Sequence, residues 1–585
     1  MNKEEQIHKI RHSLSHIMAM AVLKKFPEAK LGIGPVIEHG FYYDFILPGK
    51  LSENDLTEIE DTMREIIKQN IDFKKSAASR KDALKKIQAQ AQNFKVELVN
   101  DLPADEEITF YASGDFEDLC AGPHVNNSKE IPLDGFKLTH LAGAYWHGDE
   151  KREMMTRIYG LAFATRKELA VHLNMLEQAK LRDHRKLGKE MDLFTFSDMV
   201  GSGMPLYTPR GATIRREIIK FSNELQNSIG FQEVHTPQIN KAELFKISGH
   251  YDKYKDDMLF AHSHYSQEEF FLKPMNCPQH TQIYASNKRS YRDLPIRYSD
   301  FANLFRDEKP GELSGLTRLR CFCQDDGHAF CREDQIESEF KNILGIISVA
   351  LKVYGLDYYV RLSLWDPEHK EKYLGDEAVW DKAQKLLEGL LKDNKIKFEI
   401  GIGEAAFYGP KMDIIAKDAI GREWQISTIQ LDFNMPGRFG LSYTDKDGSE
   451  KTPVMIHRAI IGSPERFMGV LIEHYAGNFP LWLAPVQVKI LNVGQDHLSF
   501  VEKLAQEFRS EDIRVEIDSS DETVGNKIRK SSHEKVPYVL VIGDKEMGSE
   551  ELAVRVRGQK DLLNIDKQKF ITKIKTQIKH RSLDL

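Results

Sequence analysis

The last hundred residues set the narrowest limit on the fold, because strand-like and helix-like segments alternate along them. The runs VQVKILNV (486–493), IRVEID (513–518) and VPYVLVIG (536–543) are rich in the residues typical of strands. Helix-like segments separate these runs, and a fourth strand-like run, ELAVRVRG, and a last helix follow. This βαβαβ order predicts a small mixed sheet covered by helices, with Ala484-Pro485 as the hinge in front of it.

The rest of the chain is long enough to require further domains, three or four in total for 585 residues. Breaks in the pattern divide it into 1–165, a charged helical linker 166–190, a large block 191–484 and the final block 485–585. The segment GFYYDF is predicted to be a strand of the first block. In the large block, the helix RGATIRREIIKFSNELQNSIG is predicted to stop at its final glycine. The predicted class is a multidomain α+β protein.

Composition excludes several classes of protein. No run of about 18 apolar residues occurs, so no membrane span is expected. The N-terminus lacks the apolar core of a secretion signal, and five cysteines are too few for a disulfide framework. A net charge of −7 opposes indiscriminate binding of nucleic acid, although it allows a local basic patch. We therefore expect a cytoplasmic protein with no membrane partner.

Two short stretches pair histidine and cysteine residues one helical turn apart. HSLSH contains His12 and His16, and DLCAGPH contains Cys120 and His124. Apolar residues recur at helix spacing around HSLSH, which places its histidines on a face opposite the apolar stripe. Taken alone, they would be solvated surface residues. The matching pair at 120–124 makes a joint site possible, and three imidazoles with one thiol suit zinc on ligand chemistry alone.

The large block carries motifs instead of a phosphate-binding loop, since neither a P-loop nor G-x-G-x-x-G occurs. The motifs are F-R-x-E at 305–308, R-x-R-x-F-x-Q at 318–324 and G-S-x-E-R at 462–466. Together with FQEVHTP at 231–237, they resemble the three motifs of class II aminoacyl-tRNA synthetases. The resemblance implies an antiparallel sheet with helices, preceded by an α+β editing domain (1–165) and followed by an α/β anticodon-binding domain.

Three further residues resemble the zinc ligands of the threonyl-tRNA synthetase family. They are Cys277 in KPMNCPQH, His328 in QDDGHAF and His457 in MIHRAI; singly, each is typical of a buried core position. The resemblance implies one Zn²⁺ per subunit, bound with an open position that threonine fills through its amino and hydroxyl groups. Valine lacks the hydroxyl and is rejected. Serine differs by only one methyl, so a hydrolytic editing site is expected.

The same resemblance assigns editing to His12, His16, Cys120 and His124. In the family this set is understood to activate water without a metal, and Asp118 and Tyr42 are expected to support it. Bound zinc and a purely structural role remain the alternatives.

The resemblance also implies a role for each residue of the synthetic site. The reaction is ATP-dependent activation of L-threonine and its transfer to the 3′ end of tRNA(Thr). Catalytic roles are expected for Arg306, Lys411 and Gln324. ATP, with Mg²⁺, is expected to meet Arg306, Glu308, Arg318, Phe322, Gln425, Thr428 and Arg466. Threonine is expected to meet Met275, Gln324, Asp326, Tyr408 and Gln430.

Further partners follow from the resemblance. Lys545, Glu546 and Arg555 are expected to touch anticodon bases, and a homodimer is expected through the catalytic domain. Three departures from the family are expected: no β-grasp domain ahead of the editing domain, Gln279 in place of a common glycine, where it would crowd the rim of the zinc pocket, and Asp521 and Lys535 in place of Asn and Arg in the anticodon domain.

Other functions remain open at this stage. A prolyl-type class II synthetase is opposed by the combination of all three predicted zinc ligands. A synthetase-derived RNA-binding or regulatory protein is opposed by intact ATP motifs, and a free-standing editing hydrolase would not need those motifs.

Overall fold

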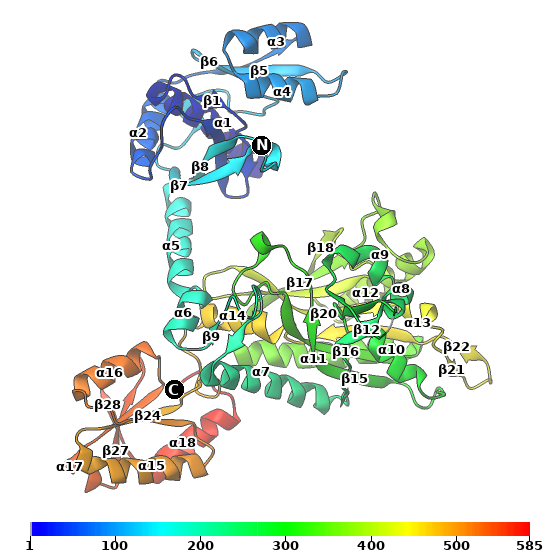
Figure 1. Cartoon of the computed structure of the whole chain (residues 1–585), viewed down its shortest axis with the longest axis vertical. Helices are drawn as coiled ribbons and strands as arrows, with labels where there is room; N and C mark the ends of the chain where they lie inside the picture. The colour runs from blue at the N-terminus through cyan, green and yellow to red at the C-terminus, as the bar shows by residue number, and fades with distance from the viewer. Residues whose placement is uncertain (1–2, 266) are drawn as a thin grey trace. The chain divides into compact units, whose positions relative to one another are not determined.

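The chain, a computed structural model that describes residues 3–265 and 267–585, divides into two compact units (Figure 1). Unit 1 is Met1–Glu177 and unit 2 is Gln178–Leu585. The boundary falls inside the predicted linker, which forms two helices, α5 (Arg166–Arg182) and α6 (His184–Glu190). Asp183 separates them because its side chain accepts a hydrogen bond from the backbone N–H of Arg185 and so caps α6.

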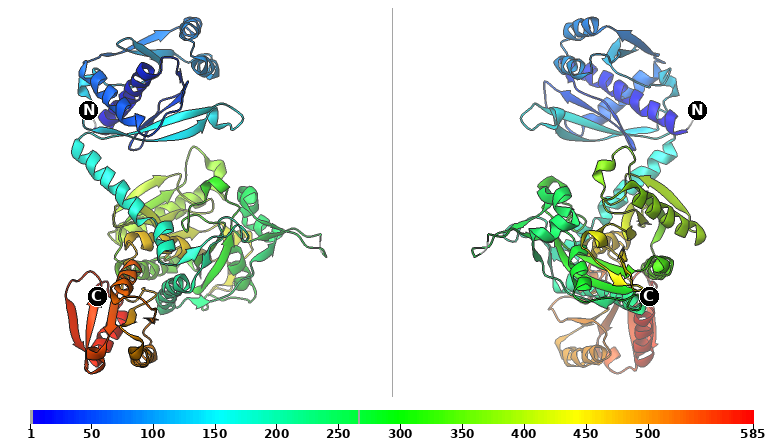
Figure 2. Two further views of the ribbon diagram at one scale, coloured as in Figure 1. Left: turned by 60° about the vertical axis from the view of Figure 1, so that its left-hand side comes forward. Right: turned by 90° about the vertical axis from the view of Figure 1, so that its right-hand side faces the viewer.

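Unit 1 contains two sheets. The larger has the strand order β1-β3-β8-β7, with β2 beside β3, and the smaller is β4-β5-β6. Helix α1 lies across one face of the larger sheet, and its apolar side chains form the core with α2 and β3 (Figure 2). The predicted strand GFYYDF is confirmed as β3. The elements are α1 (Lys3–Lys25), β1 (Lys30–Leu31), β2 (Val36–Ile37), β3 (Gly40–Ile46), α2 (Asp55–Lys68), β4 (Phe73–Ala78), α3 (Arg80–Ala89), α4 (Asn93–Asp101), β5 (Ile108–Ser113), β6 (Phe116–Leu119), β7 (Phe136–Tyr145) and β8 (Met154–Ala162).

Taken alone, HSLSH indicates two solvated surface histidines, but in the structure His12 is partly buried and His16 is buried. The helix forms as predicted, but the middle of α1 is buried on nearly all sides, and His16 is only 2% exposed. The face opposite the sheet is covered by the loop after β6, where Val125 N donates to Ser13 Oγ over 3.1 Å. A helix covered on both sides cannot be oriented from its own apolar stripe.

An eight-stranded sheet dominates unit 2, in the order β11-β15-β16-β23-β20-β19-β17-β18. Its pairs are antiparallel except at the edges, where β11–β15 and β17–β18 are parallel. Helices α7, α11 and α14 cover one face with the main core of the molecule, and the other face carries the site. The predicted stop of α7 is confirmed by Gly230, which has φ +84°. The sheet strands and main helices are α7 (Pro209–Ser228), β11 (Gln232–Glu233), α10 (Cys277–Ala285), β15 (Ile296–Phe305), β16 (Cys321–Cys331), α11 (Ile336–Tyr354), β17 (Asp357–Leu364), α12 (Glu377–Asp393), β18 (Phe398–Ile402), β19 (Lys411–Lys417), β20 (Glu423–Asp432), β23 (Val454–Ala459) and α14 (Pro464–His474).

Smaller elements surround this sheet. They are β9 (Phe194–Thr195), β10 (Leu206–Tyr207), β12 (Ile239–Lys241), α8 (Ala242–Ser248), α9 (His250–Tyr254), β13 (Phe260–Ala261), β14 (Phe270–Leu272), α13 (Met435–Arg438), β21 (Tyr443–Thr444) and β22 (Glu450–Lys451).

The C-terminal block confirms the predicted mixed sheet, in the order β25-β24-β26-β27-β28. The first three strands are mutually parallel and the last two antiparallel. Helices α15 and α18 pack on one face through Phe508 and Phe570, and α16 packs on the other through Ile528. Strand β28 is an addition to the prediction. The elements are β24 (Val488–Asn492), α15 (Leu498–Ser510), β25 (Val515–Asp518), α16 (Val524–His533), β26 (Tyr538–Ile542), α17 (Asp544–Met547), β27 (Glu551–Val556), β28 (Leu562–Asp566) and α18 (Lys567–Lys579).

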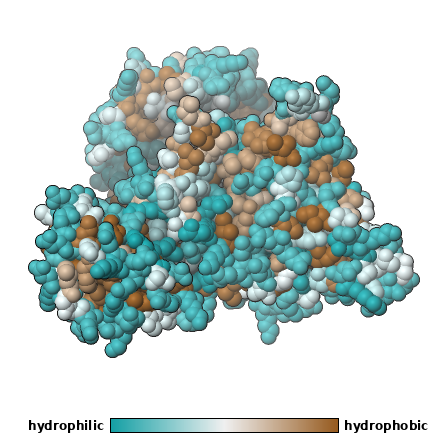
Figure 3. Space-filling model, turned by 60° about the horizontal axis from the view of Figure 1, so that its bottom comes forward, coloured by the Kyte–Doolittle hydropathy of each residue, from teal (hydrophilic) through white to brown (hydrophobic). Residues whose placement is uncertain are grey.

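The surface agrees with the composition. Figure 3 shows a face on which hydrophilic residues predominate and hydrophobic residues form separate patches. Within the described part of the chain, no helix combines the length and apolarity needed to cross a membrane. All five cysteines are free thiols.

Candidate active site and histidine–cysteine clusters

Strand register brings the predicted metal ligands of unit 2 together. His328 on β16 lies directly opposite His457 on β23, and His457 lies opposite Gln430 on β20. Because side chains alternate between the faces of a strand, Phe322, Gln324, Asp326 and His328 all point to one face of β16. Cys277 reaches the same place from the start of α10.

The three ligand atoms of Cys277, His328 and His457 lie within 4.8 Å of one another, and all three side chains are buried. Burial raises the pKa of the Cys277 thiol and lowers that of His328, so the apoprotein holds both groups neutral. One thiol and two imidazoles are soft and borderline ligands that suit zinc, and three protein ligands leave a fourth position open. The residues therefore fit a zinc ion.

Neighbouring groups fix the orientation of both imidazoles. His457 Nε2 donates to Asp432 Oδ2 over 3.0 Å, which leaves Nδ1 as the lone-pair nitrogen facing the cluster. His328 Nδ1 is hydrogen-bonded to His280 Nδ1 at 2.7 Å, and its Nε2 lies 3.0 Å from His457 Nδ1. Asp432 and His280 were not predicted from the sequence. Only His280 had a visible signal, its place one helical turn after Cys277.

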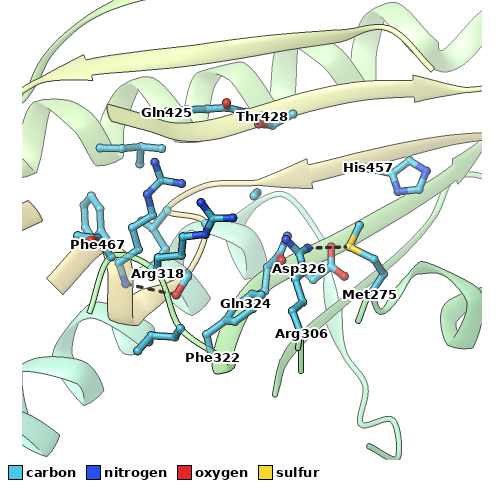
Figure 4. Close-up of a pocket in the computed structure, with 18 of the residues that line it drawn as sticks. Met275, Arg306, Arg318, Phe322, Gln324, Asp326, Gln425, Thr428, His457 and Phe467 are labelled. Atoms are coloured by element: carbon cyan, nitrogen blue, oxygen red, sulfur yellow. Dashed lines mark hydrogen bonds between the residues drawn. The ribbon is translucent and has the colours of Figure 1, made fainter. Parts of the chain in front are cut away.

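A cavity of about 620 Å³ extends from this cluster along the open face of the sheet. Figure 4 shows Gln425 and Thr428 on one side of it and Arg306 and Phe322 on the other. Fourteen of the predicted residues line it, namely Met275, Arg306, Glu308, Arg318, Phe322, Gln324, Asp326, His328, Tyr408, Gln425, Thr428, Gln430, His457 and Arg466.

Two guanidinium groups give the cavity its anion-binding character. Across the described residues, neither Arg306 nor Arg466 forms an ion pair with a carboxylate, and burial lowers the pKa of both. Arg306 Nη2 lies 3.3 Å from Met275 Sδ, and its guanidinium lies 5.2 Å from the centre of the Phe322 ring. Partly buried cations without a protein counter-ion are costly unless an anion joins them. The cavity is therefore suited to phosphate or carboxylate groups.

Other predicted residues are held by protein partners. Arg318 Nε pairs with Glu308 at 2.8 Å, and Arg318 Nη2 pairs with Glu312 at 2.9 Å. Lys411 does not line the cavity, because its Nζ pairs with Asp413 Oδ2 at 2.7 Å. The second oxygen of Asp413 accepts from Gln425 and Thr428, so Lys411 reaches the cavity only through these neighbours.

The Gln279 side chain turns away from the zinc pocket, contrary to the prediction. It is buried and does not line the cavity. Its amide nitrogen donates hydrogen bonds to the backbone oxygens of Asn276 (3.0 Å) and Met275 (3.3 Å), and its amide oxygen accepts a hydrogen bond from Asn240 Nδ2 (3.1 Å). Gln279 therefore braces the turn that carries Met275 and Cys277.

The second cluster lies in unit 1 and joins α1 to the loop after β6. The ligand atoms of His12, His16, Cys120 and His124 lie within 4.8 Å of one another. Cys120 Sγ is 3.3 Å from His12 Nε2 and 3.2 Å from His124 Nε2. Burial lowers the pKa of His12 to about 4, lowers those of His16 and His124 well below the ordinary value, and raises that of Cys120 to about 11. At neutral pH the cluster is uncharged.

Behind this cluster Asp118 is buried and pairs with Tyr43, whereas Tyr42, the other residue expected to support the cluster, does not contact it. Tyr43 Oη donates to Asp118 Oδ2, and Lys95 Nζ pairs with Asp118 Oδ1 at 2.7 Å. Tyr42 points to the other face of the sheet, where Arg157 lies 3.8 Å from its ring centre. Sequence reasoning missed Lys95, which carried no local signal.

The predicted anticodon residues lie at two places of the C-terminal sheet, since α17 follows the last residue of β26 whereas Arg555 pairs with Val539 near the start of that strand. Lys545 and Glu546 are on α17 and Arg555 is on β27. Lys545 and Arg555 are exposed, and Glu546 Oε2 accepts from Gly543 N at 3.0 Å.

The antiparallel sheet, its helix-covered rear face and the arginine-lined cavity define a class II aminoacyl-tRNA synthetase. The model of the tRNA synthetase class II core domain (G, H, P, S and T) matches residues 260–475. Two further models match: Anticodon binding domain at 487–577, and Threonyl and Alanyl tRNA synthetase second additional domain at 108–159. The chain belongs to the threonyl-tRNA synthetase family and is a threonine–tRNA ligase.

The relatives cover almost the whole chain. It is 46% identical to a threonine–tRNA ligase of Gloeobacter violaceus, over 99% of this chain and 93% of the relative. It is 47% identical to that of Deinococcus radiodurans, over 94% and 85%.

Among solved structures, the RNA binding domain of threonyl-tRNA synthetase from Cryptosporidium parvum matches with a TM-score of 0.64 and 36% identity, over 67% of this chain and 98% of that one. A Giardia lamblia prolyl-tRNA synthetase matches in fold alone, with a TM-score of 0.55 and 15% identity over 70% and 81%. The prolyl alternative is wrong, because the relatives that match nearly the whole chain at 46–47% identity are threonine–tRNA ligases.

Proposed function

We propose that the cavity of unit 2 activates L-threonine with ATP and that Cys277, His328 and His457 hold one zinc ion beside it. The observation that carries this proposal is the meeting of three buried ligand atoms from distant segments at the edge of a cavity with two unpaired guanidinium groups. When bound, zinc supplies an open coordination position for the amino and hydroxyl groups of threonine.

In this proposal the ATP phosphates lie along the arginines. Arg306 contacts the α-phosphate and the threonine carboxylate, and its fixed charge stabilises the transition state of adenylation. Arg318 contacts the γ-phosphate, which requires it to exchange Glu312 or Glu308 for the nucleotide. Glu308 then accepts from the adenine amino group, and the ring stacks between Phe322 and Arg466. Mg²⁺ accompanies the ATP.

The remaining lining residues orient threonine. Gln324 and Asp326 hold its ammonium group, and Met275, Tyr408 and Gln430 enclose its side chain. Gln425 and Thr428 are held by Asp413, to which Lys411 contributes its charge. An apolar pocket would separate valine from threonine by only about 10–200-fold, so selection by the hydroxyl is needed.

Unit 1 is proposed to hydrolyse seryl-tRNA(Thr). The uncharged His12–His16–Cys120–His124 cluster supports a metal-free site, because neutral imidazoles offer lone pairs that accept hydrogen bonds from a water molecule and orient it. Asp118, held by Tyr43 and Lys95, anchors the base of the loop that carries Cys120. Bound zinc is the alternative on ligand chemistry.

We propose a cytoplasmic homodimer that binds tRNA(Thr) through the C-terminal sheet, with Lys545, Glu546 and Arg555 at the anticodon. The dimer proposal is supported by four large hydrophobic side chains exposed within eleven residues, Phe196, Met199, Val200 and Leu206. Val200 also lines a cavity of about 950 Å³ that runs along α7 from Ala212 to Asn227.

Metal analysis combined with aminoacylation tests the synthetic proposal. The protein should contain one zinc per chain and charge tRNA(Thr) with threonine. Cys277→Ala should lose both zinc and charging while circular dichroism stays that of the wild type. Retention of full charging by a zinc-free Cys277→Ala protein would overturn the proposal.

A further inference from the structure

His184 joins three distant segments of unit 2. It is the first residue of α6, 3% exposed, and it lies between the end of α14 and the loop that follows β15. Its Nδ1 is 2.6 Å from Glu473 Oε1, and its Nε2 accepts a hydrogen bond from Leu316 N over 2.9 Å. The backbone N–H of His184 also donates to Glu473 Oε1, over 3.0 Å.

These contacts fix the hydrogen positions of the ring. An ionised Glu473 accepts hydrogen bonds only, so Nδ1 of His184 carries the hydrogen. In the neutral ring Nε2 is then the acceptor, which is the role that Leu316 N–H requires. Each ring nitrogen therefore forms one hydrogen bond: Nδ1 donates to Glu473, and Nε2 accepts from the Leu316 N–H.

The same groups form a cluster of one histidine and two carboxylates, Asp183–His184–Glu473, but they do not make a metal site. Asp183 already pairs with Arg185, and Glu473 already pairs with Arg422. Both carboxylates are neutralised by guanidinium groups, and neither imidazole nitrogen has a lone pair to spare. The cluster is a hydrogen-bonded support.

The loop passes directly over this support. A Cβ on Gly315 would lie 2.1 Å from His184 Nε2, and Gly315 has φ +48°, so only glycine fits there without strain. A Cβ on Gly469 of α14 would lie 3.4 Å from Leu316 Cβ and 3.6 Å from His184 Cδ2. The loop and the imidazole ring are thus packed together against α14.

The residues held in this way face the nucleotide cavity. Leu316, Thr317 and Arg318 all line it. We propose that His184 is a positioning residue for ATP: by accepting the Leu316 N–H, it holds the loop so that Arg318 meets the triphosphate. This rests on the proposed binding of ATP in the cavity.

Two substitutions separate the acceptor function from the packing of the ring. In His184→Asn the amide nitrogen takes the place of Nδ1 and keeps the bond to Glu473, but no acceptor reaches Leu316. In His184→Gln the side-chain oxygen takes the place of Nε2 and restores that acceptor. Gly315→Ala displaces the loop from the imidazole ring by a change in the loop itself. It replaces His184→Asn as the test if that variant does not fold.

The measurements are KM for ATP and for threonine in pyrophosphate exchange by the zinc-loaded full chain, with deuterium exchange of the Leu316 amide. His184→Asn should raise KM for ATP about five- to tenfold, as expected for one hydrogen bond, and leave KM for threonine within about twofold. The Leu316 amide should exchange faster in His184→Asn. His184→Gln should restore both the KM for ATP and the exchange rate of this amide. Gly315→Ala should resemble His184→Asn.

The proposal is overturned if His184→Asn and Gly315→Ala leave KM for ATP unchanged. It is also overturned if they raise both KM values equally while lowering the melting temperature, since that is a merely structural role. A wild-type protein that shows no threonine-dependent exchange contradicts the proposed function instead, and the Leu316 amide still reports whether His184 holds the loop.

Discussion

At the scale of single residues, burial explains the chemistry of the cluster in unit 1. The ligand atoms of three histidines and a cysteine lie within 4.8 Å of one another, and burial makes it costly to charge any of these side chains. The cluster is thus held neutral, and in the proposed editing site its imidazole lone pairs position a water molecule beside Cys120 Sγ, which lies close to His12 and His124.

Cys120→Ala is expected to leave threonylation by unit 2 unchanged and to abolish hydrolysis of seryl-tRNA(Thr). The reason is that the thiol contacts both His12 and His124, whereas no residue of the synthetic cavity belongs to this cluster. Deacylation of purified seryl-tRNA(Thr) measures the effect, and threonine charging is the control. Normal deacylation by the variant would show that the editing assignment is wrong.

Unit 1 is expected to lose stability as the pH falls from about 6.5 toward about 4. The pKa of His12 is depressed to about 4 in the fold, so over this window the unfolded chain takes up a proton that the folded chain does not. The stabilising contribution is present above the unfolded value of 6.5 and is lost below it. Urea-dependent deuterium exchange of peptides from unit 1 measures this loss.

Carboxylates also take up protons as the pH falls toward 4, so two variants of α1 are needed to separate the contribution of His12 to the loss of stability from theirs. His12→Asn should make the loss between pH 6.5 and 4 smaller, while His8→Asn, at an exposed position four residues earlier, should behave as wild type. Equal pH dependence in all three proteins would contradict the assignment of the loss to His12.

At the scale of elements, a buried ion pair fixes the strands that carry the zinc ligands. Asp325 on β16 pairs with Arg458 on β23, and both are fully buried on the face opposite the cavity. Asp325 Oδ2 also accepts from Ser222 of α7 (2.8 Å) and from the backbone N–H of Ile460 (3.1 Å). The pair thereby locks the register that places His328 opposite His457.

Asp325→Ala is expected to lower the free energy of unfolding of unit 2 by about 3–5 kcal/mol, because it leaves the Arg458 charge buried and unpaired. Urea denaturation followed by tryptophan fluorescence measures this change. The control Asp393→Ala, at an exposed position on α12, should stay within about 0.5 kcal/mol of wild type. A similar small effect for Asp325→Ala would contradict the role of the ion pair.

The elements also show what the sequence could and could not predict. Local patterns predicted α7 with its glycine stop, β3 and the βαβαβ order, since these depend on neighbouring residues. The burial of α1 could not be predicted, because the loop that covers it lies a hundred residues further on. The site residues were found by resemblance to family motifs, whereas Asp432, Lys95 and Tyr43 were given no role from the sequence and meet the site only through strand pairing and packing.

At the scale of the whole molecule, the proposed assembly depends on the exposed hydrophobic segment before α7. Met199→Asp is expected to convert the dimer to a monomer, because Met199 is 95% exposed and a charge there would be desolvated in an interface. Light scattering after size exclusion measures the mass. Met154→Asp, at a 62% exposed position in unit 1, should leave the dimer intact. A dimeric Met199→Asp protein would place the interface elsewhere.

The whole molecule divides the choice of amino acid between two chemistries. Unit 2 selects for a hydroxyl at the proposed zinc ion, and unit 1 removes the smaller serine that this selection admits. Both steps are needed because size alone separates similar amino acids only weakly. A difference of one methyl group contributes about 1–3 kcal/mol.

The most direct test of this account is pyrophosphate exchange by the zinc-loaded chain with threonine, serine and valine in parallel. The account predicts strong exchange with threonine, exchange with serine reduced about 10–200-fold, and none with valine. Exchange with valine equal to that with serine would show that the pocket reads size and not the hydroxyl, and would contradict the proposed role of the Cys277–His328–His457 site.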